Sequence, residues 1–216
     1  MAVKPGDPAA VEQLFNDVAP RYDRLNDVLS LGLHRQWKRQ ALIWLNPRPG
    51  EHWLDVCCGT GDLALALART VRPSGSVIGV DAAAAPLGRA EARRRREPWL
   101  KVSWQQADAL ATGLPNASAD GAVMAYGLRN LADPAAGLAE MCRVLKPNRR
   151  AAVLDFNRLP EQSLAAIFQR QYLRKVVVPA AALAGFKDQY AYLEESLKCF
   201  ATGKEQEAMA LAAGFR

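Results

Sequence analysis

Residues 54–62, Leu-Asp-Val-Cys-Cys-Gly-Thr-Gly-Asp, form the stretch whose residue types are best suited to bind a ligand. Gly59 and Gly61 allow a tight turn and a close approach of the backbone to a bound molecule. The stretch follows an expected strand and opens an expected helix, whose free N–H groups and positive dipole end attract electron-rich groups. The sequence therefore predicts a small-molecule site here. Gly59-x-Gly61-x-x-Ala64 taken alone also matches a dinucleotide-binding pattern.

Acidic residues follow two further expected strands. Asp81 lies 20 residues after Gly61, and its carboxylate could accept hydrogen bonds from both hydroxyls of a ribose. Ala107, Asp108 and Ala109 come at the end of the next strand, in a place suited to an adenine ring. The carboxyl ends of parallel strands meet at one edge of a sheet, so these residues predict a nucleotide-like cofactor in a single crevice.

Strands and helices alternate through the middle of the chain. Strands are expected at 52–56, 76–80, 102–106, 121–126 and 151–156, and helices at 62–70, 84–97 and 135–145. This alternation predicts an α/β fold with a mostly parallel sheet and helices on both faces.

The segments before and after these alternating strands and helices are predicted to be mainly helical. Residues 1–46 are expected to form an amino-terminal helical lid or cap, which ends at the breaker Asn-Pro-Arg-Pro-Gly. Residues 47–216 would form the cofactor-binding domain, with a helical substrate region at about 160–205.

Composition narrows the class of protein. The 216 residues carry a net charge of +6, and 50% are hydrophobic, so a folded core is expected. The four cysteines form no C-x-x-C pair, so we expect no metal site and a reducing, cytoplasmic location. No apolar run is long enough to span a bilayer. The charge alone does not select a partner, and the oligomeric state is not readable from the sequence.

The motifs resemble a known enzyme family. Residues 55–62 are similar to the first motif of class I S-adenosylmethionine-dependent methyltransferases, which have a Rossmann-like fold. Residues 15–27, 126–130 and 143–147 narrow the resemblance to the ubiquinone/menaquinone-biosynthesis C-methyltransferase family. The resemblance covers roughly residues 11–216. It implies a seven-stranded sheet whose last two strands form an antiparallel pair, and because we count only five strands, we expect that carboxy-terminal pair to be missing.

The family resemblance implies S-adenosylmethionine as the cofactor. Gly59, Thr60 and Gly61 would line its methionine and ribose part, and Asp81 would hold the ribose. Ala125 would make contact through its backbone only. The full set of implied cofactor-binding residues is Asp55, Gly59, Thr60, Gly61, Asp81, Asp108, Ala109 and Ala125.

The implied reaction is methylation of a ring carbon of a reduced prenylated naphthoquinone. Arg129 and Asn130 would orient the substrate and stabilise its developing oxyanion. The alternative is that Arg129 pairs with Asp133 and that Asn130 caps the following segment. Tyr22 and Asp23 are further catalytic candidates in the expected lid, and the general base is not identifiable from the sequence.

Three local features point to a type of substrate. Cys57-Cys58 and residues 32–35 and 154–156 resemble cyanobacterial members that convert 2-phytyl-1,4-naphthoquinol to phylloquinol. Demethylmenaquinol or a ubiquinol precursor is the alternative acceptor. An NAD-dependent oxidoreductase and a non-catalytic cofactor-binding protein are alternatives of other classes. We also expect peripheral contact with the membrane that holds a phytylated substrate, and no nucleic-acid partner.

Overall fold

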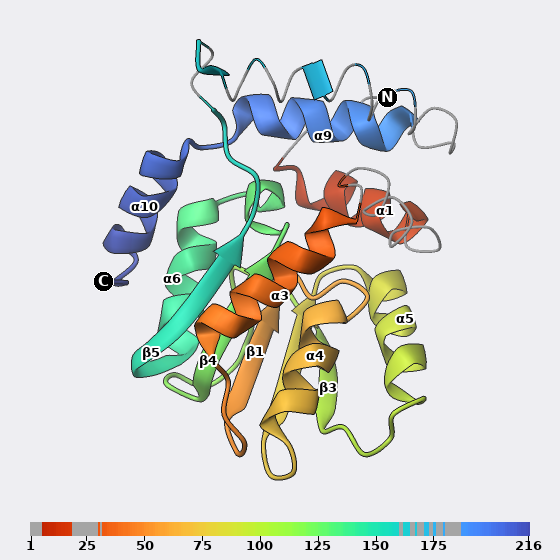
Figure 1. Cartoon of the computed structure of the whole chain (residues 1–216), viewed down its shortest axis with the longest axis vertical. Coiled ribbons are helices and arrows are strands. Elements are labelled where there is room, and N and C mark those ends of the chain that lie inside the picture. Colours follow the sequence, from red (N-terminus) through yellow and green to blue (C-terminus); the bar gives the residue numbers. More distant parts are fainter. Residues whose placement is uncertain are drawn as a thin grey trace.

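A computed structural model of the chain describes residues 6–18, 30, 32–159, 162–164, 167, 171–172, 175, 179 and 187–216. Within them a five-stranded sheet lies between helices, with the strand order β3-β2-β1-β4-β5 (Figure 1). All four strand pairs are parallel. The strands are β1 (His52–Val56), β2 (Ser76–Asp81), β3 (Val102–Gln106), β4 (Ala119–Ala125) and β5 (Leu145–Leu154).

Helices follow or precede each strand. The helices of the described residues are α1 (Pro8–Val18), α3 (Leu33–Leu45), α4 (Asp62–Val71), α5 (Ala84–Arg94), the short 3-10 helix η2 (Leu128–Asn130), α6 (Pro134–Val144), α9 (Lys187–Cys199) and α10 (Gly203–Ala212). Figure 1 shows α1 and α9 beyond the carboxyl ends of the central strands, where a ligand is expected in such a sheet.

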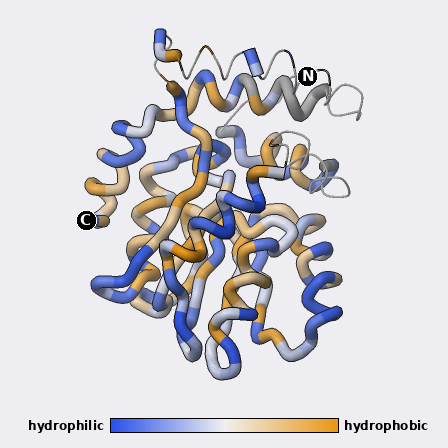
Figure 2. Tube along the Cα trace, in the orientation of Figure 1, coloured by the Kyte–Doolittle hydropathy of each residue, from blue (hydrophilic) through white to orange (hydrophobic). Residues whose placement is uncertain are grey.

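Alternate residues of the central strands enter two separate cores. Trp53 and Val123 pack with α4 on one face, and Leu54 and Met124 pack with α6 on the other. A strand that is buried on both faces must be apolar at nearly every position, which explains why β4 is apolar from Gly121 to its end. Figure 2 shows the hydrophobic residues along the sheet and its inner helix faces, with hydrophilic residues on the outer side of α5.

The predicted α/β alternation is confirmed, with differences at some boundaries. Helix α5 ends at Arg94 instead of residue 97, because Pro98 disfavours a helical conformation at the residue before it and turns replace the last helical residues. Strand β4 ends at Ala125, because Tyr126 has a φ of 61° and leaves the extended conformation. Strand β5 begins at Leu145 instead of residue 151, and a register shift in its pairing with β4 accommodates the extra length.

Strand β5 lies at one edge of the sheet in the described part of the chain. The five strands there correspond to the five that the sequence predicted. Helix α3 packs beside this edge, and Arg150 of β5 donates a hydrogen bond to the Trp44 carbonyl of α3.

Candidate active site

A cavity of about 380 Å³ opens at the carboxyl end of the sheet. Its size lies within the range of about 300–1,000 Å³ that is usual for small-molecule sites. Its walls come from the loops after β1, β2, β3 and β4, and from α1 through Val11 and Phe15. The cavity therefore lies where the sequence predicted the crevice. The predicted site residues in its wall are Gly59, Asp81, Asp108, Ala109, Ala125 and Asn130.

The loop after β1 takes a conformation that requires glycine. Gly59 and Gly61 have φ values of 53° and 81°, in the left-handed region. A Cβ on Gly61 would also lie 2.6 Å from the Trp104 ring. Cys57 has a φ of 54° and lines the cavity, so the loop is strained at a residue that can contact a ligand.

Two basic side chains from neighbouring helices hold this loop in place. Arg93 of α5 donates hydrogen bonds to the carbonyl and hydroxyl oxygens of Thr60, and it pairs with Asp62 at 2.5 Å. Lys38 of α3 pairs with the other carboxylate oxygen of Asp62 at 3.1 Å. Burial acts to raise the pKa of Asp62, but these two cations outweigh it and lower the pKa. The side chain of Thr60 is thus engaged in fixing the loop.

Asp81 joins the loops after β1 and β2. Its two carboxylate oxygens accept hydrogen bonds from the N–H groups of Gly59, at 2.8 Å, and Ala83, at 3.0 Å. Burial raises the pKa of Asp81, and the same N–H groups act to lower it. Both oxygens keep lone pairs for a ligand, so the carboxylate can accept hydrogen bonds from adjacent hydroxyls in the cavity.

Asp55 lies beneath the glycine loop, and it is 2% exposed. Its carboxylate accepts a hydrogen bond from the Ala64 N–H at 2.9 Å, near the beginning of α4. Burial raises its pKa to about 8, although nearby Lys38 acts to lower it. Asp55 and Thr60 line a small recess beside the main cavity, whereas Gly61 lies behind the loop against Trp104.

Three of the predicted residues shape the far wall of the cavity. The Asp108 carboxylate accepts a hydrogen bond from the Leu110 N–H at 2.9 Å, which closes the turn after β3. Ala109 is 6% exposed and offers an apolar surface beside it. Ala125 ends β4 and lines both the cavity and the recess.

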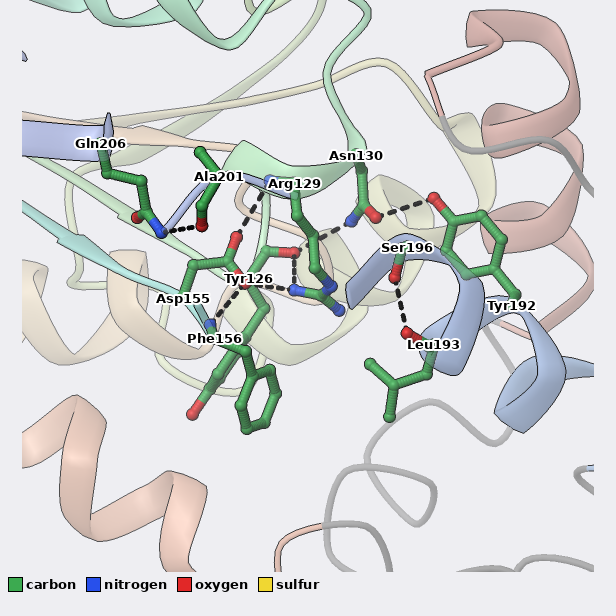
Figure 3. Close-up of polar contacts among 10 residues, drawn as sticks. All are labelled: Tyr126, Arg129, Asn130, Asp155, Phe156, Tyr192, Leu193, Ser196, Ala201 and Gln206. Carbon is green, nitrogen blue, oxygen red and sulfur yellow. Dashed lines mark hydrogen bonds and ion pairs between the residues drawn. The ribbon is translucent and has the colours of Figure 1, made fainter. Parts of the chain in front are cut away.

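The residues after β4 form a continuous polar network (Figure 3). The guanidinium of Arg129 donates to Asp155 at 2.5 Å and to the Tyr126 carbonyl at 3.0 Å. The side-chain amide of Asn130 donates to the same carbonyl at 3.0 Å and accepts from the Tyr192 hydroxyl at 2.8 Å. Of the two residues predicted to orient the substrate, Asn130 lines the cavity. Arg129 does not belong to the cavity wall and pairs with Asp155 behind it.

The alternative arrangement of Arg129 and Asn130 is wrong. Arg129 pairs with Asp155, and Asp133 instead caps α6 by accepting a hydrogen bond from the Ala136 N–H at 3.0 Å. The Asn130 amide is directed back to Tyr126 instead of capping the next segment.

Sequence reasoning missed several residues of the site, and two predicted ones cannot be placed. Tyr22 and Asp23 lie outside the described residues. No role in the site was predicted for Lys38, Arg93, Asp155 or Tyr192, because each acts through a partner from a distant part of the sequence. The position of Asp155 could have been noticed, because it lies near the carboxyl end of the strand expected at 151–156, and polar residues at strand ends gather at the ligand-binding edge.

The chain matches the family model described as the ubiE/COQ5 methyltransferase family over residues 3–216. The chain belongs to this family. Among curated proteins, it is 48% identical over 210 residues to a 2-phytyl-1,4-naphtoquinone methyltransferase of Synechococcus elongatus, covering 97% of this chain and 90% of that protein. It is 41% identical over 205 residues to the chloroplastic 2-phytyl-1,4-beta-naphthoquinone methyltransferase of Arabidopsis thaliana, covering 94% and 78%.

Solved structures share the fold of this ubiE/COQ5 family member. A SAM dependent methyltransferase from Aquifex aeolicus matches with a TM-score of 0.53 and 21% identity, over 83% of this chain and 88% of that one. Phosphoethanolamine N-methyltransferase 2 of Haemonchus contortus matches with a TM-score of 0.61 and 19% identity, over 83% and 36%. The predicted Rossmann-like class I methyltransferase fold is thereby confirmed.

Family membership also confirms the predicted enzyme class, a methyltransferase with S-adenosylmethionine as its methyl donor, over the NAD-dependent and non-catalytic alternatives. The cavity fits this molecule: the glycine loop permits close backbone approach, Asp81 offers acceptors for hydroxyls, and Ala109 offers an apolar surface for a ring. Among the described residues, no helix combines the length and apolar composition needed to cross a membrane.

Proposed function

We propose that this methyltransferase methylates a ring carbon of 2-phytyl-1,4-naphthoquinol and so forms phylloquinol. The observation that carries the proposal is the 48% identity, over 97% of this chain, to a relative whose name specifies the phytylated naphthoquinone. The same substrate is named for the relative from Arabidopsis thaliana. The cavity supports the proposal, because its wall carries polar groups that can bind the donor and a substrate oxygen.

The reduced ring is the form that can react. Removal of a hydroxyl proton makes the adjacent ring carbon a nucleophile, whereas the oxidised ring is electron-poor and has no hydroxyl to ionise. When bound, S-adenosylmethionine supplies a methyl group to that carbon and keeps the electron pair of the broken sulfur–methyl bond, while the ring carbon loses its proton. The protein must therefore orient a phenolate-like oxygen and exclude water.

We assign the donor's binding to the loops after β1, β2 and β3. Asp81 would accept hydrogen bonds from the ribose, with its geometry set by the N–H groups of Gly59 and Ala83. Asp108 and Ala109 would flank the adenine. The loop that contains Thr60 and Gly61 would face the methionine part, with Asp55 supporting it from below and Ala125 in contact through its backbone.

We assign the substrate side to the residues after β4. Asn130 is in the cavity wall, and its amide nitrogen has a second N–H that can stabilise the substrate oxygen. Arg129 would position this loop, because it binds the same Tyr126 carbonyl as Asn130 does. Tyr22 and Asp23 remain candidates for proton removal from the substrate.

The amino-terminal segment and the region around α9 are assigned to the lid and to the substrate side. Helix α1 places Val11 and Phe15 in the cavity wall, which supports residues 1–46 as a lid and residues 47–216 as the cofactor-binding domain. Helix α9 falls in the substrate region of about 160–205. Because a phytyl chain is hydrocarbon and partitions into lipid, we propose that the enzyme acts from the cytoplasm in peripheral contact with a membrane.

An acceptor panel tests this function. The purified chain is incubated with S-adenosylmethionine and with reduced 2-phytyl-1,4-naphthoquinone, demethylmenaquinone or a ubiquinone precursor, and the products are analysed by mass spectrometry. We expect the phytylated naphthoquinol to be methylated with the highest kcat/KM. Faster methylation of either other quinol would contradict the substrate assignment and leave the family assignment intact.

A further inference from the structure

We propose that Tyr192 of α9 is a positioning residue that fixes the side-chain amide of Asn130 in the wall of the cavity. The Tyr192 hydroxyl donates to Asn130 Oδ1 at 2.8 Å, across 62 residues of sequence. Both side chains are buried, with 6% and 8% of their surface exposed. Figure 3 shows Tyr192 reaching from α9 to Asn130, on the side opposite Arg129. The kinetic part of this inference rests on the proposed function.

The two contacts of the Asn130 amide define its orientation. The Tyr126 carbonyl can only accept a hydrogen bond, so the amide nitrogen of Asn130 must face it, at 3.0 Å. The amide oxygen then faces the Tyr192 hydroxyl. A half-turn of the amide would set its oxygen against the Tyr126 carbonyl oxygen, and this repulsion between two acceptors excludes the turned form. The second N–H of the amide is consequently held in one direction.

Tyr192 is suited to act as a constant donor. Burial raises the pKa of its hydroxyl to about 12, while Arg129 acts to lower it and Asp155 to raise it. The hydroxyl therefore keeps its proton at neutral pH. Neighbouring residues of α9 are buried as well: Leu193 and Ser196 are 7% and 1% exposed. A buried hydrogen bond from such a helix restricts the amide more strongly than a solvent-exposed one.

Kinetics of Tyr192→Phe test the inference, with Ser196→Ala as the matched control. Each variant removes one buried hydroxyl from α9, but among the described residues the Ser196 hydroxyl donates within its own helix, to the Leu193 carbonyl at 2.9 Å. We expect Tyr192→Phe to lower kcat about tenfold, with the Kd of S-adenosylmethionine unchanged, because a hydrogen bond that orients a transition-state group is lost. Ser196→Ala should keep the wild-type kcat. Equal kcat values for Tyr192→Phe and the wild type would overturn the inference.

A second variant shows whether Tyr192 acts through Asn130. In an Asn130→Ala background, Tyr192→Phe should cause no further loss of kcat, since the group that it positions is gone. A further tenfold loss there would mean that Tyr192 acts independently, which contradicts the proposal.

NMR spectroscopy provides a readout that needs no methyl acceptor. In the ¹⁵N-labelled chain, the side-chain amide pair that disappears in Asn130→Ala belongs to Asn130. Tyr192→Phe should shift this pair, and Ser196→Ala should not. An unshifted pair in Tyr192→Phe overturns the inference, whatever the acceptor is. If the wild-type chain methylates no quinol, the proposed function fails, and the NMR result still decides the role of Tyr192.

Discussion

The carboxylate of Asp155 binds Arg129 twice, through the guanidinium at 2.5 Å and through the backbone N–H at 3.1 Å. Asp155 follows β5 and Arg129 follows β4, so the pair joins the ends of two neighbouring strands. The Asp155 side chain has no exposed surface, and that of Arg129 is 10% exposed. A charge left alone in such surroundings is costly, so this pair fixes the loop that carries Asn130.

Removal of one member of this pair should destabilise the fold. Arg129→Ala is expected to lower the free energy of unfolding by about 3–5 kcal/mol, because Asp155 would stay buried without its partner. The double variant Arg129→Ala/Asp155→Ala should lose less than the sum of the two single variants. Urea denaturation measures all three. Arg149→Ala is the control, since its pairs with Asp120 and Glu51 are partly exposed and should contribute at most about 1 kcal/mol each. Comparable losses for Arg129→Ala and Arg149→Ala would contradict this account.

Asp81→Asn should weaken the binding of S-adenosylmethionine by about 1–3 kcal/mol. The Asn side chain would place an NH2 group against a backbone N–H that now donates to the carboxylate, and the ribose would lose a charged acceptor. Calorimetry measures the affinity. Asp120→Asn is the control, because Asp120 lies at the amino end of β4 and pairs with Lys146. Wild-type affinity in a folded Asp81→Asn variant would refute the ribose contact.

Gly61→Ala and Gly88→Ala should have opposite effects on the stability of the protein. Gly61 has a φ of 81°, and an added Cβ would meet the Trp104 ring at 2.6 Å, so the variant should lose both stability and cofactor affinity. Gly88 lies in α5, and no atom of the described residues outside that helix is within 4 Å of its Cβ position, so alanine there should raise helix stability by about 0.5–1 kcal/mol. Thermal melting with and without S-adenosylmethionine compares them. Equal melting temperatures would show that the loop adapts to a side chain.

Stability should depend on pH through Asp55. Its pKa in the folded protein, about 8, is above the ordinary value, so the folded state binds more protons than the unfolded state between about pH 4 and pH 8. Stability therefore falls as pH rises through this window. The Asn side chain of Asp55→Asn does not titrate. The free energy of unfolding of this variant should therefore rise relative to that of the wild type as the pH rises, by up to about 1.4 kcal/mol per pH unit.

Chemical denaturation at several pH values, without S-adenosylmethionine, measures this gain. Asp62→Asn is the control. Burial acts to raise the pKa of Asp62, but Lys38 and Arg93 hold it below the ordinary value. Asp62 is therefore ionised in both states above about pH 5, and its difference from the wild type should stay constant. A constant difference for Asp55→Asn as well would show that Asp55 is ionised in the folded protein.

Local patterns were sufficient to predict the framework of the fold. The mostly buried stretch at 52–56 and the glycines after it can be recognised from neighbours in the sequence, so β1 and the loop were predicted correctly. The positions of Asp81, Asp108 and Ala109 at the cavity followed from the topology of a parallel sheet, which brings strand ends together.

Contacts between distant segments could not be predicted in this way. The pairing of Arg129 with Asp155 depends on the register of β4 and β5, and the contact of Tyr192 with Asn130 depends on where α9 packs. Neither follows from residue spacing. The family resemblance identified the loop at 126–130, but only the structure shows that Asn130 faces the cavity while Arg129 holds the loop from behind.

Methyl transfer to the reduced ring is the central claim, and isotope labelling tests it most directly. The chain is incubated with S-adenosylmethionine carrying a deuterated methyl group and with 2-phytyl-1,4-naphthoquinone, once under strict reduction and once fully oxidised. Mass spectrometry and NMR then locate the label. We predict a labelled methyl group on the ring carbon, formed only with the reduced substrate. A label on oxygen, equal product from the oxidised quinone, or no product from a folded chain that binds S-adenosylmethionine would contradict the account.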